Sequence, residues 1–134
     1  MGYLEAFTTY VDQDIWQYFK DGRSVINGPP LKEPFDQNGY MGHHGTPFNT
    51  PLFIYKAISD NVTPIYSTDV LVNRYCEVGV DVLYERNTVG DHLSEMMNGN
   101  ARAVAWLQAA CDGTRKENYG TGGCEIRNVS VGPS

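Results

Sequence analysis

The chain has 134 residues, a formal net charge of −6 and a hydrophobic content of 41%. This length is enough for one modest domain with its own core, and the negative charge argues against binding to nucleic acid or to an anionic membrane surface. No stretch approaches the roughly 18 apolar residues of a membrane-spanning helix, and we expect no signal peptide, because the N-terminus lacks a basic start and a long apolar run.

Residues 2–20 carry the clearest helical pattern of the chain. The apolar positions, three or four residues apart, are Leu4, Phe7, Val11, Ile15 and Tyr18. This spacing predicts one amphipathic helix that faces the core. The alternative is a cap helix bordering an acyl-chain site, because aromatic stripes also line lipid pockets.

Residues 21–50 are rich in Gly and Pro, which predicts a long irregular loop that covers or serves a site. His43 and His44 lie in it. Adjacent side chains of an extended chain point in opposite directions, and no Cys or Glu stands nearby at the spacing of metal ligands. The sequence therefore indicates no metal site and no cofactor.

A βαβ pattern follows. Residues 52–58 form a short apolar run that ends in a polar turn at residues 59–61, as is typical of a buried strand. We predict a helix from Thr63 to Gly79, with Thr63 as its cap, and a second strand over residues 80–85. The two strands of such a unit run parallel, so their C-terminal ends lie at the same edge of the sheet.

Asp60 follows the first of these strands and His92 follows the second. Neighbouring strands lie about 4.8 Å apart, so we expect the two side chains to meet. An acid and a histidine in this chain order are the last two members of an α/β-hydrolase triad. Taken alone, Asp60 is better explained by an Asx turn. Asp91 is a rival acid, although a residue seldom reaches the ring of its own neighbour.

The C-terminal third holds a predicted helix over residues 93–111, with a weak point at residues 98–100, and a short extended piece at residues 124–129. Its predicted apolar side consists of Leu93, Met96, Met97, Val104, Leu107 and Cys111. Two N-glycosylation sequons occur. We expect Asn128, in the polar tail, to be the glycan site and Asn61, beside Asp60, to be bare.

Cys76, Cys111 and Cys124 are the cysteines of the chain. In a secreted protein the most economical disulfide is Cys111–Cys124, which would join the tail to the last helix. Cys76 would then stay free or pair with a segment elsewhere. The alternative is three buried reduced thiols.

Six short motifs stand in a fixed order: PLFIYKA (51–57), SDNVTP (59–64), YCEVG (75–79), GDHL (90–93), AWL (105–107) and DGT (112–114). Over roughly residues 38–128 the chain thereby resembles the C-terminal third of the fungal secretory lipases of the lipase A type. The resemblance implies the α/β class, with a βαβ unit and final helix from the C-terminal part of an α/β-hydrolase. Residues 1–50 would be the end of a helical cap and its connecting loop, residues 51–112 the core and residues 113–134 a tail.

The same resemblance implies a secreted hydrolase of acyl-ester or lipid substrates, with Asp60 as the triad acid and His92 as the base. The serines are Ser24, Ser59, Ser67, Ser94, Ser130 and Ser134, and none has the Gly-x-Ser-x-Gly frame of a nucleophile elbow. We therefore expect the nucleophile and the oxyanion-hole donors upstream of Met1, in a missing N-terminal part, and an inactive isolated chain. The alternatives are a non-catalytic remnant acting as a binding module, a small-metabolite deacetylase of the same family, and an α/β-hydrolase that cleaves peptides.

Overall fold

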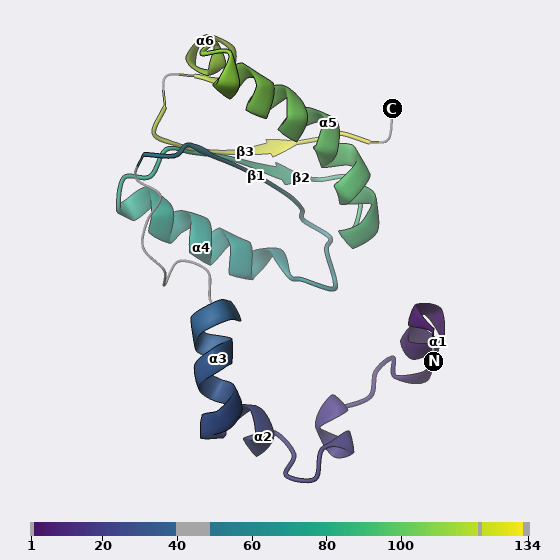
Figure 1. Ribbon diagram of the computed structural model, residues 1–134. Coiled ribbons are helices and arrows are strands. Elements are labelled where there is room, and N and C mark those ends of the chain that lie inside the picture. Colours follow the sequence, from purple (N-terminus) through teal and green to yellow (C-terminus); the bar gives the residue numbers. More distant parts are fainter. Residues whose placement is uncertain (1, 40–48, 121, 133–134) are drawn as a thin grey trace. The chain divides into compact units, whose positions relative to one another are not determined.

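The computed structural model describes residues 2–39, 49–120 and 122–132, and it divides the chain into two units, residues 1–43 and 44–134. His43 and His44 lie outside the described residues. The elements are α1 (Tyr3–Thr9), η1 (Ile15–Tyr18), α2 (Ser24–Asn27), α3 (Pro29–Gly39), β1 (Leu52–Ala57), α4 (Ile65–Glu77), β2 (Val82–Asn87), α5 (His92–Cys111), α6 (Arg115–Tyr119) and β3 (Cys124–Val129) (Figure 1).

The first unit differs from the prediction in two ways. The helix expected over residues 2–20 stops at Thr9, because Asp12 takes a left-handed conformation (φ 58°) and Asp14 caps a separate turn of 3-10 helix by accepting from the Trp16 backbone at 3.1 Å. The loop expected over residues 21–50 instead contains α2 and α3. Proline suits the first turn of a helix, where its missing N–H is not needed, and α3 begins with two of them.

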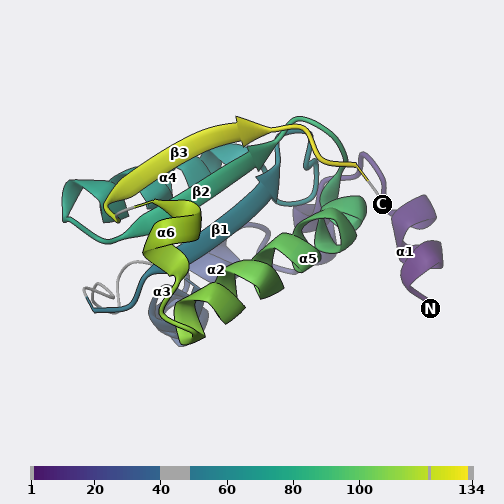
Figure 2. The same cartoon turned by 90° about the horizontal axis from the view of Figure 1, so that it is seen from above.

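The second unit is built around a parallel sheet with strand order β1-β2-β3. β1 pairs with β2 from Leu52↔Val82 to Ala57↔Asn87, and β2 pairs with β3 from Val82↔Cys124 to Asn87↔Val129. Figures 1 and 2 show α4 on one face of the sheet and α5 with α6 on the other. The βαβ unit and the α/β class predicted from the sequence are confirmed.

The apolar core lies between the sheet and α4. Val72 and Tyr75 of α4 pack against Val82 and Tyr84 of β2, together with Val80. Because successive strand residues point to opposite faces, the other side chains of β1 meet α5. There Phe53 stacks on Trp106 with ring centroids 5.8 Å apart, and the ring of Tyr55 lies against Gly99.

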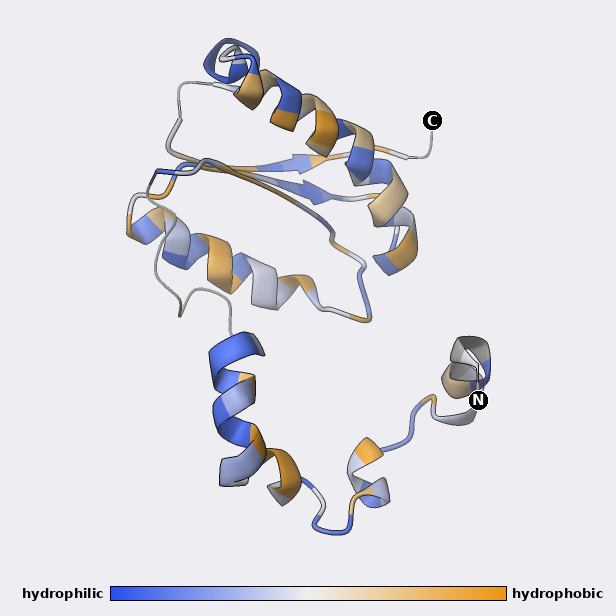
Figure 3. Cartoon of the chain, in the orientation of Figure 1, coloured by the Kyte–Doolittle hydropathy of each residue, from blue (hydrophilic) through white to orange (hydrophobic). Residues whose placement is uncertain are grey.

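Helix α5 is continuous through the predicted weak point at residues 98–100, and the side predicted to be apolar is not the side it buries. Its buried residues are Glu95, Asn98, Gly99, Trp106 and Ala109. Leu93, Met96, Met97, Val104, Leu107 and Cys111 are exposed, Met97 to 79%. Figure 3 shows hydrophobic residues spaced along this helix. Periodicity alone missed the buried side because small and paired charged residues face the sheet.

The disulfide predicted between Cys111 and Cys124 is wrong. The structure joins Cys76 to Cys124, with their Cα atoms 5.3 Å apart, and leaves Cys111 as an exposed free thiol. The physical reason is the parallel pairing of β3 with β2. Cys124 lies opposite Val82 at the start of β2, and the end of α4, which carries Cys76, leads directly into that strand.

Candidate functional site

Asp60 and His92 lie at the C-terminal edge of the parallel strands β1 and β2. The loop after β1 turns back through a hydrogen bond from the Asp60 backbone to the Ala57 carbonyl, at 3.3 Å. His92 is the first residue of α5, which follows β2. The two side chains meet, with His92 Nδ1 2.9 Å from Asp60 Oδ2.

The Asp60 carboxylate is almost fully buried, with 5% of its side chain exposed, and both of its oxygens accept hydrogen bonds. Oδ1 accepts from the backbone N–H groups of Val62 and Thr63, at 2.9 and 2.8 Å. These local bonds form the Asx turn that the sequence alone favoured. Oδ2 accepts from the Thr63 hydroxyl at 2.9 Å, from Lys56 Nζ at 2.6 Å and from His92. The backbone of the turn therefore fixes Oδ1, while Thr63, Lys56 and His92 share Oδ2.

These bonds govern the charge of the acid. Burial by itself raises the pKa of the Asp60 carboxyl group, but the hydrogen bonds it accepts, that from Lys56 foremost, outweigh burial and hold this pKa well below its ordinary value of 3.8. Asp60 is thus an anion at neutral pH and at mildly acidic pH.

The sequence did not single out Lys56 and Thr63 as site residues. Lys56 is the one charged residue of the apolar strand β1, and it stands four positions before Asp60. Thr63, expected to cap α4, instead turns its hydroxyl to Asp60 and lies 3.4 Å from His92 Nδ1. A charged residue in an otherwise apolar strand, close in sequence to a candidate acid, is the signal that identifies Lys56.

Asp91 does not compete with Asp60 for the imidazole. Its Oδ1 accepts from the backbone of Leu93 and Ser94 at 3.1 and 2.9 Å, which makes Asp91 the N-cap of α5. Backbone and side-chain hydrogen bonds from Ser94 lower the pKa of this exposed carboxyl group. Its function in the structure is to begin the helix that carries His92.

The asparagines of both sequons are exposed. Asn128 lies on β3, and Asn61 directly follows Asp60 in the loop after β1. Among the described residues, no group of three or more His, Cys, Asp or Glu side chains is placed to hold a metal ion. No helix in the described ranges has the length and apolarity needed to cross a membrane.

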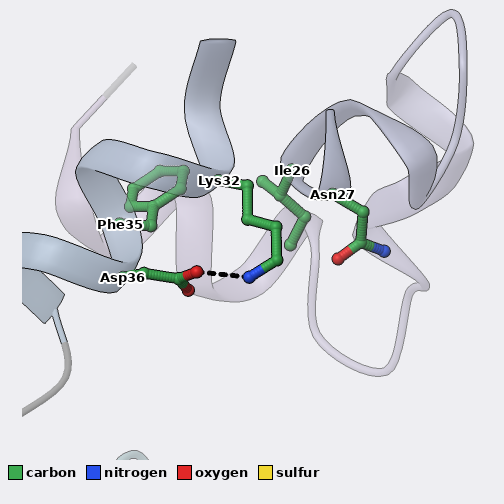
Figure 4. Close-up of a pocket in the computed structure, with 5 residues that line it drawn as sticks. All are labelled: Ile26, Asn27, Lys32, Phe35 and Asp36. Atoms are coloured by element: carbon green, nitrogen blue, oxygen red, sulfur yellow. Dashed lines mark hydrogen bonds and ion pairs between the residues drawn. The ribbon is translucent and has the colours of Figure 1, made fainter. Parts of the chain in front are cut away.

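Described residues of the first unit line two hollows. Ile26, Asn27, Lys32, Phe35 and Asp36 line one of them, with Lys32 and Asp36 ion-paired one helical turn apart (Figure 4). It offers neither a histidine nor a nucleophile, so we assign it no part in catalysis. Tyr10, Gln13, Ile15, Tyr18 and Phe19 line the other, which is mostly apolar.

Known proteins resemble the chain both in sequence and in fold. The family model described as secretory lipase matches residues 2–118. A trichothecene C-3 esterase of Fusarium sporotrichioides is 44% identical over 94% of this chain and 28% of its own length. A probable trichothecene esterase of Stachybotrys chartarum is 42% identical over 96% and 26%, and a lipase A of Arthroderma benhamiae is 33% identical over 87% and 24%.

The crystal structure of Candida antarctica lipase A superimposes with a TM-score of 0.63 over 79% of this chain and 25% of that protein, at 21% identity. The same lipase in its closed state gives a TM-score of 0.58 over 68% and 22%. These likenesses show the fold. The chain spans about a quarter of the length of the curated relatives named above.

Proposed function

The chain belongs to the secretory lipase family, and we propose that it carries the acid and the base of a carboxylic-ester hydrolase, with Asp60 as the acid and His92 as the base. The observation that carries the proposal is the hydrogen bond between Asp60 Oδ2 and His92 Nδ1 at 2.9 Å. It joins two residues that are 32 positions apart in sequence, each beyond the end of one of two parallel strands, in the chain order of an α/β-hydrolase triad.

In this proposal, Asp60 holds the proton of His92 on Nδ1, and Nε2 is left to accept the proton of an attacking serine. The same nitrogen then returns the proton to the leaving alcohol. The carboxylate stabilises the imidazolium formed between these two steps. A buried anion suits this role because its charge faces the ring without being screened by water.

We propose that the serine and the oxyanion-hole donors come from polypeptide outside these 134 residues, since no serine of the chain has the elbow frame. The free edge of β1 supports this, because within the described residues β1 pairs only with β2. The exposed apolar residues of α5 also suit a surface that further chain covers. The isolated chain is then inactive.

The substrate class we favour is an ester of a small secondary metabolite, because the trichothecene esterases are 44% and 42% identical to this chain and the lipase A is 33% identical. Triacylglycerol is the second candidate, and the apolar hollow of the first unit would suit an acyl chain. The exported, oxidised state implied by the family name agrees with the Cys76–Cys124 disulfide.

The test is ester hydrolysis by the complete protein. It should cleave p-nitrophenyl acetate and a trichothecene esterified at C-3 in preference to p-nitrophenyl palmitate and triolein, and a fluorophosphonate should label one serine outside the present chain. A preference for long acyl chains would select the lipase alternative. Complete protein that neither turns over esters nor reacts with the phosphonate would mark it as a binding module and overturn the proposal.

A further inference from the structure

Lys56 supplies a partly buried cation at the site. Only 14% of its side chain is exposed, and Nζ lies 2.6 Å from Asp60 Oδ2 and also donates to the Thr63 hydroxyl. An ammonium that is largely withdrawn from water needs a partner, and Asp60 is the anion it reaches. The oxygen it contacts is the one that faces His92.

One carboxylate oxygen is therefore shared between an ammonium and an imidazole. If His92 becomes protonated, two cations, the Lys56 ammonium and the His92 imidazolium, contact the same oxygen of Asp60. Lys56 offsets part of the negative charge that would otherwise stabilise the imidazolium, and like charges in one site disfavour the charged form of each.

We propose that Lys56 is a positioning residue of the Asp60–His92 pair, which holds the carboxylate in place and lowers the affinity of His92 for a proton. As a role in catalysis this rests on the proposed ester hydrolase. As a coupling between two side chains it rests on the geometry of this chain alone.

The other charged groups around the pair have partners of their own. Arg86, opposite Lys56 in the β1–β2 register, binds Asp69 of α4 at 3.1 Å. Asp91 caps α5, and Glu95 of the same helix contacts Asn87 and Arg102. In the described part of the chain, Lys56 is the cation bonded to the carboxylate that His92 contacts.

The experiment is an NMR titration of the His92 ring in the 134-residue chain, for the wild type and for K56M, K56R and K116M. We expect K56M to move the midpoint of the imidazole titration upward by about one pH unit. K56R, which keeps the charge, and K116M, which removes the exposed Lys116 of α6, should leave the midpoint unchanged. A K56M midpoint equal to or below that of the wild type would overturn the proposal.

A measurement on the unmodified protein covers the case in which K56M does not fold. Coupling is reciprocal, so the ¹⁵N signal of the Lys56 ammonium should shift with the same midpoint as the His92 ring. If the ¹⁵N chemical shift of the Lys56 ammonium stays constant while the His92 ring titrates, the proposed coupling is wrong, and no variant is needed to show it.

Activity measurements on the complete protein distinguish the proposal for Lys56 from the proposed ester hydrolase function on which its catalytic role rests. In the complete protein, K56M should shift the acidic limb of the kcat/KM profile upward by about one pH unit, as in the titration. If the titrations couple but the complete protein hydrolyses no ester, the proposed function fails and the Lys56 coupling stands. If esters are hydrolysed with an unshifted limb and the signals do not couple, only the role of Lys56 fails.

Discussion

A Cβ atom on Gly99 would stand 2.0 Å from Cδ2 of the Tyr55 ring and 2.7 Å from its Cγ. Tyr55 lies on β1, the strand that leads to Asp60, and Gly99 lies two turns along the helix that begins at His92. The absence of a side chain at position 99 lets this helix lie close to this strand. This contact thereby helps to hold His92, at the start of α5, beside Asp60, which follows β1.

We predict that Gly99→Ala destabilises the fold. In an ordinary helix this change stabilises by about 0.5–1 kcal/mol, but here the methyl group meets the inner atoms of an aromatic ring, and overpacking of this kind costs about 1–3 kcal/mol. Denaturant unfolding measures the difference. Asn100→Ala, an exposed change on the same helix, is the matched control and should be close to neutral or stabilising. In a Tyr55→Ala background, where the ring is absent, Gly99→Ala should lower the unfolding free energy by less than it does in the wild type. An equal cost in both backgrounds would show that the ring is not the cause.

We predict that Asp60→Asn in the complete protein lowers kcat about 10⁴-fold, because an amide no longer holds the His92 proton on Nδ1. His92→Ala should reduce turnover at least as far. The comparison is Asp91→Asn, which changes the neighbouring acid but keeps a good helix cap and should retain nearly full activity. If Asp91→Asn were the damaging change and Asp60→Asn harmless, the acid role would pass to Asp91.

Acid stability should depend on Asp60 in a defined direction. Its folded-state pKa lies below the ordinary value of 3.8, so its ionised form contributes stability that is fully present above about pH 5 and is lost progressively as the pH falls through 3.8 toward the folded-state value. Urea unfolding of the wild type and of Asp60→Asn between about pH 3 and pH 5 checks this. The stability advantage of the wild type should shrink as the pH falls across this range. An advantage that grows from about pH 5 to about pH 3 would contradict the assignment.

The disulfide should be found between Cys76 and Cys124 by peptide mapping under non-reducing conditions, with Cys111 recovered as a free thiol. The bridge closes a loop with a sequence separation of 48 residues, for which the chain-entropy estimate is about 4 kcal/mol. Cys76→Ser and Cys124→Ser should each lower the unfolding free energy by roughly this amount, and Cys111→Ser should not. A Cys111–Cys124 peptide in the digest would overturn this pairing.

The sequence predicted best those parts in which local pattern and tertiary structure agree. Apolar runs and turn residues predict a strand at residues 52–58, a crossover helix and a second strand, and the structure has all three, although β1 ends at Ala57 and is half-buried over most of its length. Their parallel pairing brought Asp60 and His92 to one edge of the sheet, and the structure has them in contact. Whether they act as acid and base remains a prediction.

The errors come from contacts that a single sequence does not reveal. The exposed stripe of α5 was predicted to be buried because Glu95 and Arg102, which neutralise each other against the sheet, read as surface residues. Glu85 is likewise buried between Arg102 and Arg127. The disulfide was misassigned because proximity in sequence favoured Cys111, whereas strand pairing places Cys124 beside the end of α4.

The bond between α4 and β3 makes the third strand sensitive to the compartment in which the protein folds. β3 reaches the sheet only after two helices have intervened, so its pairing is non-local and forms slowly compared with helices. Under reducing conditions the ladder and the Asn87 side chain, which binds the backbone of Val131 through both its oxygen and its amide nitrogen, would retain the strand by themselves. In an oxidising compartment the Cys76–Cys124 disulfide adds a covalent link, which keeps the start of β3 beside β2 even when the hydrogen-bonded ladder opens.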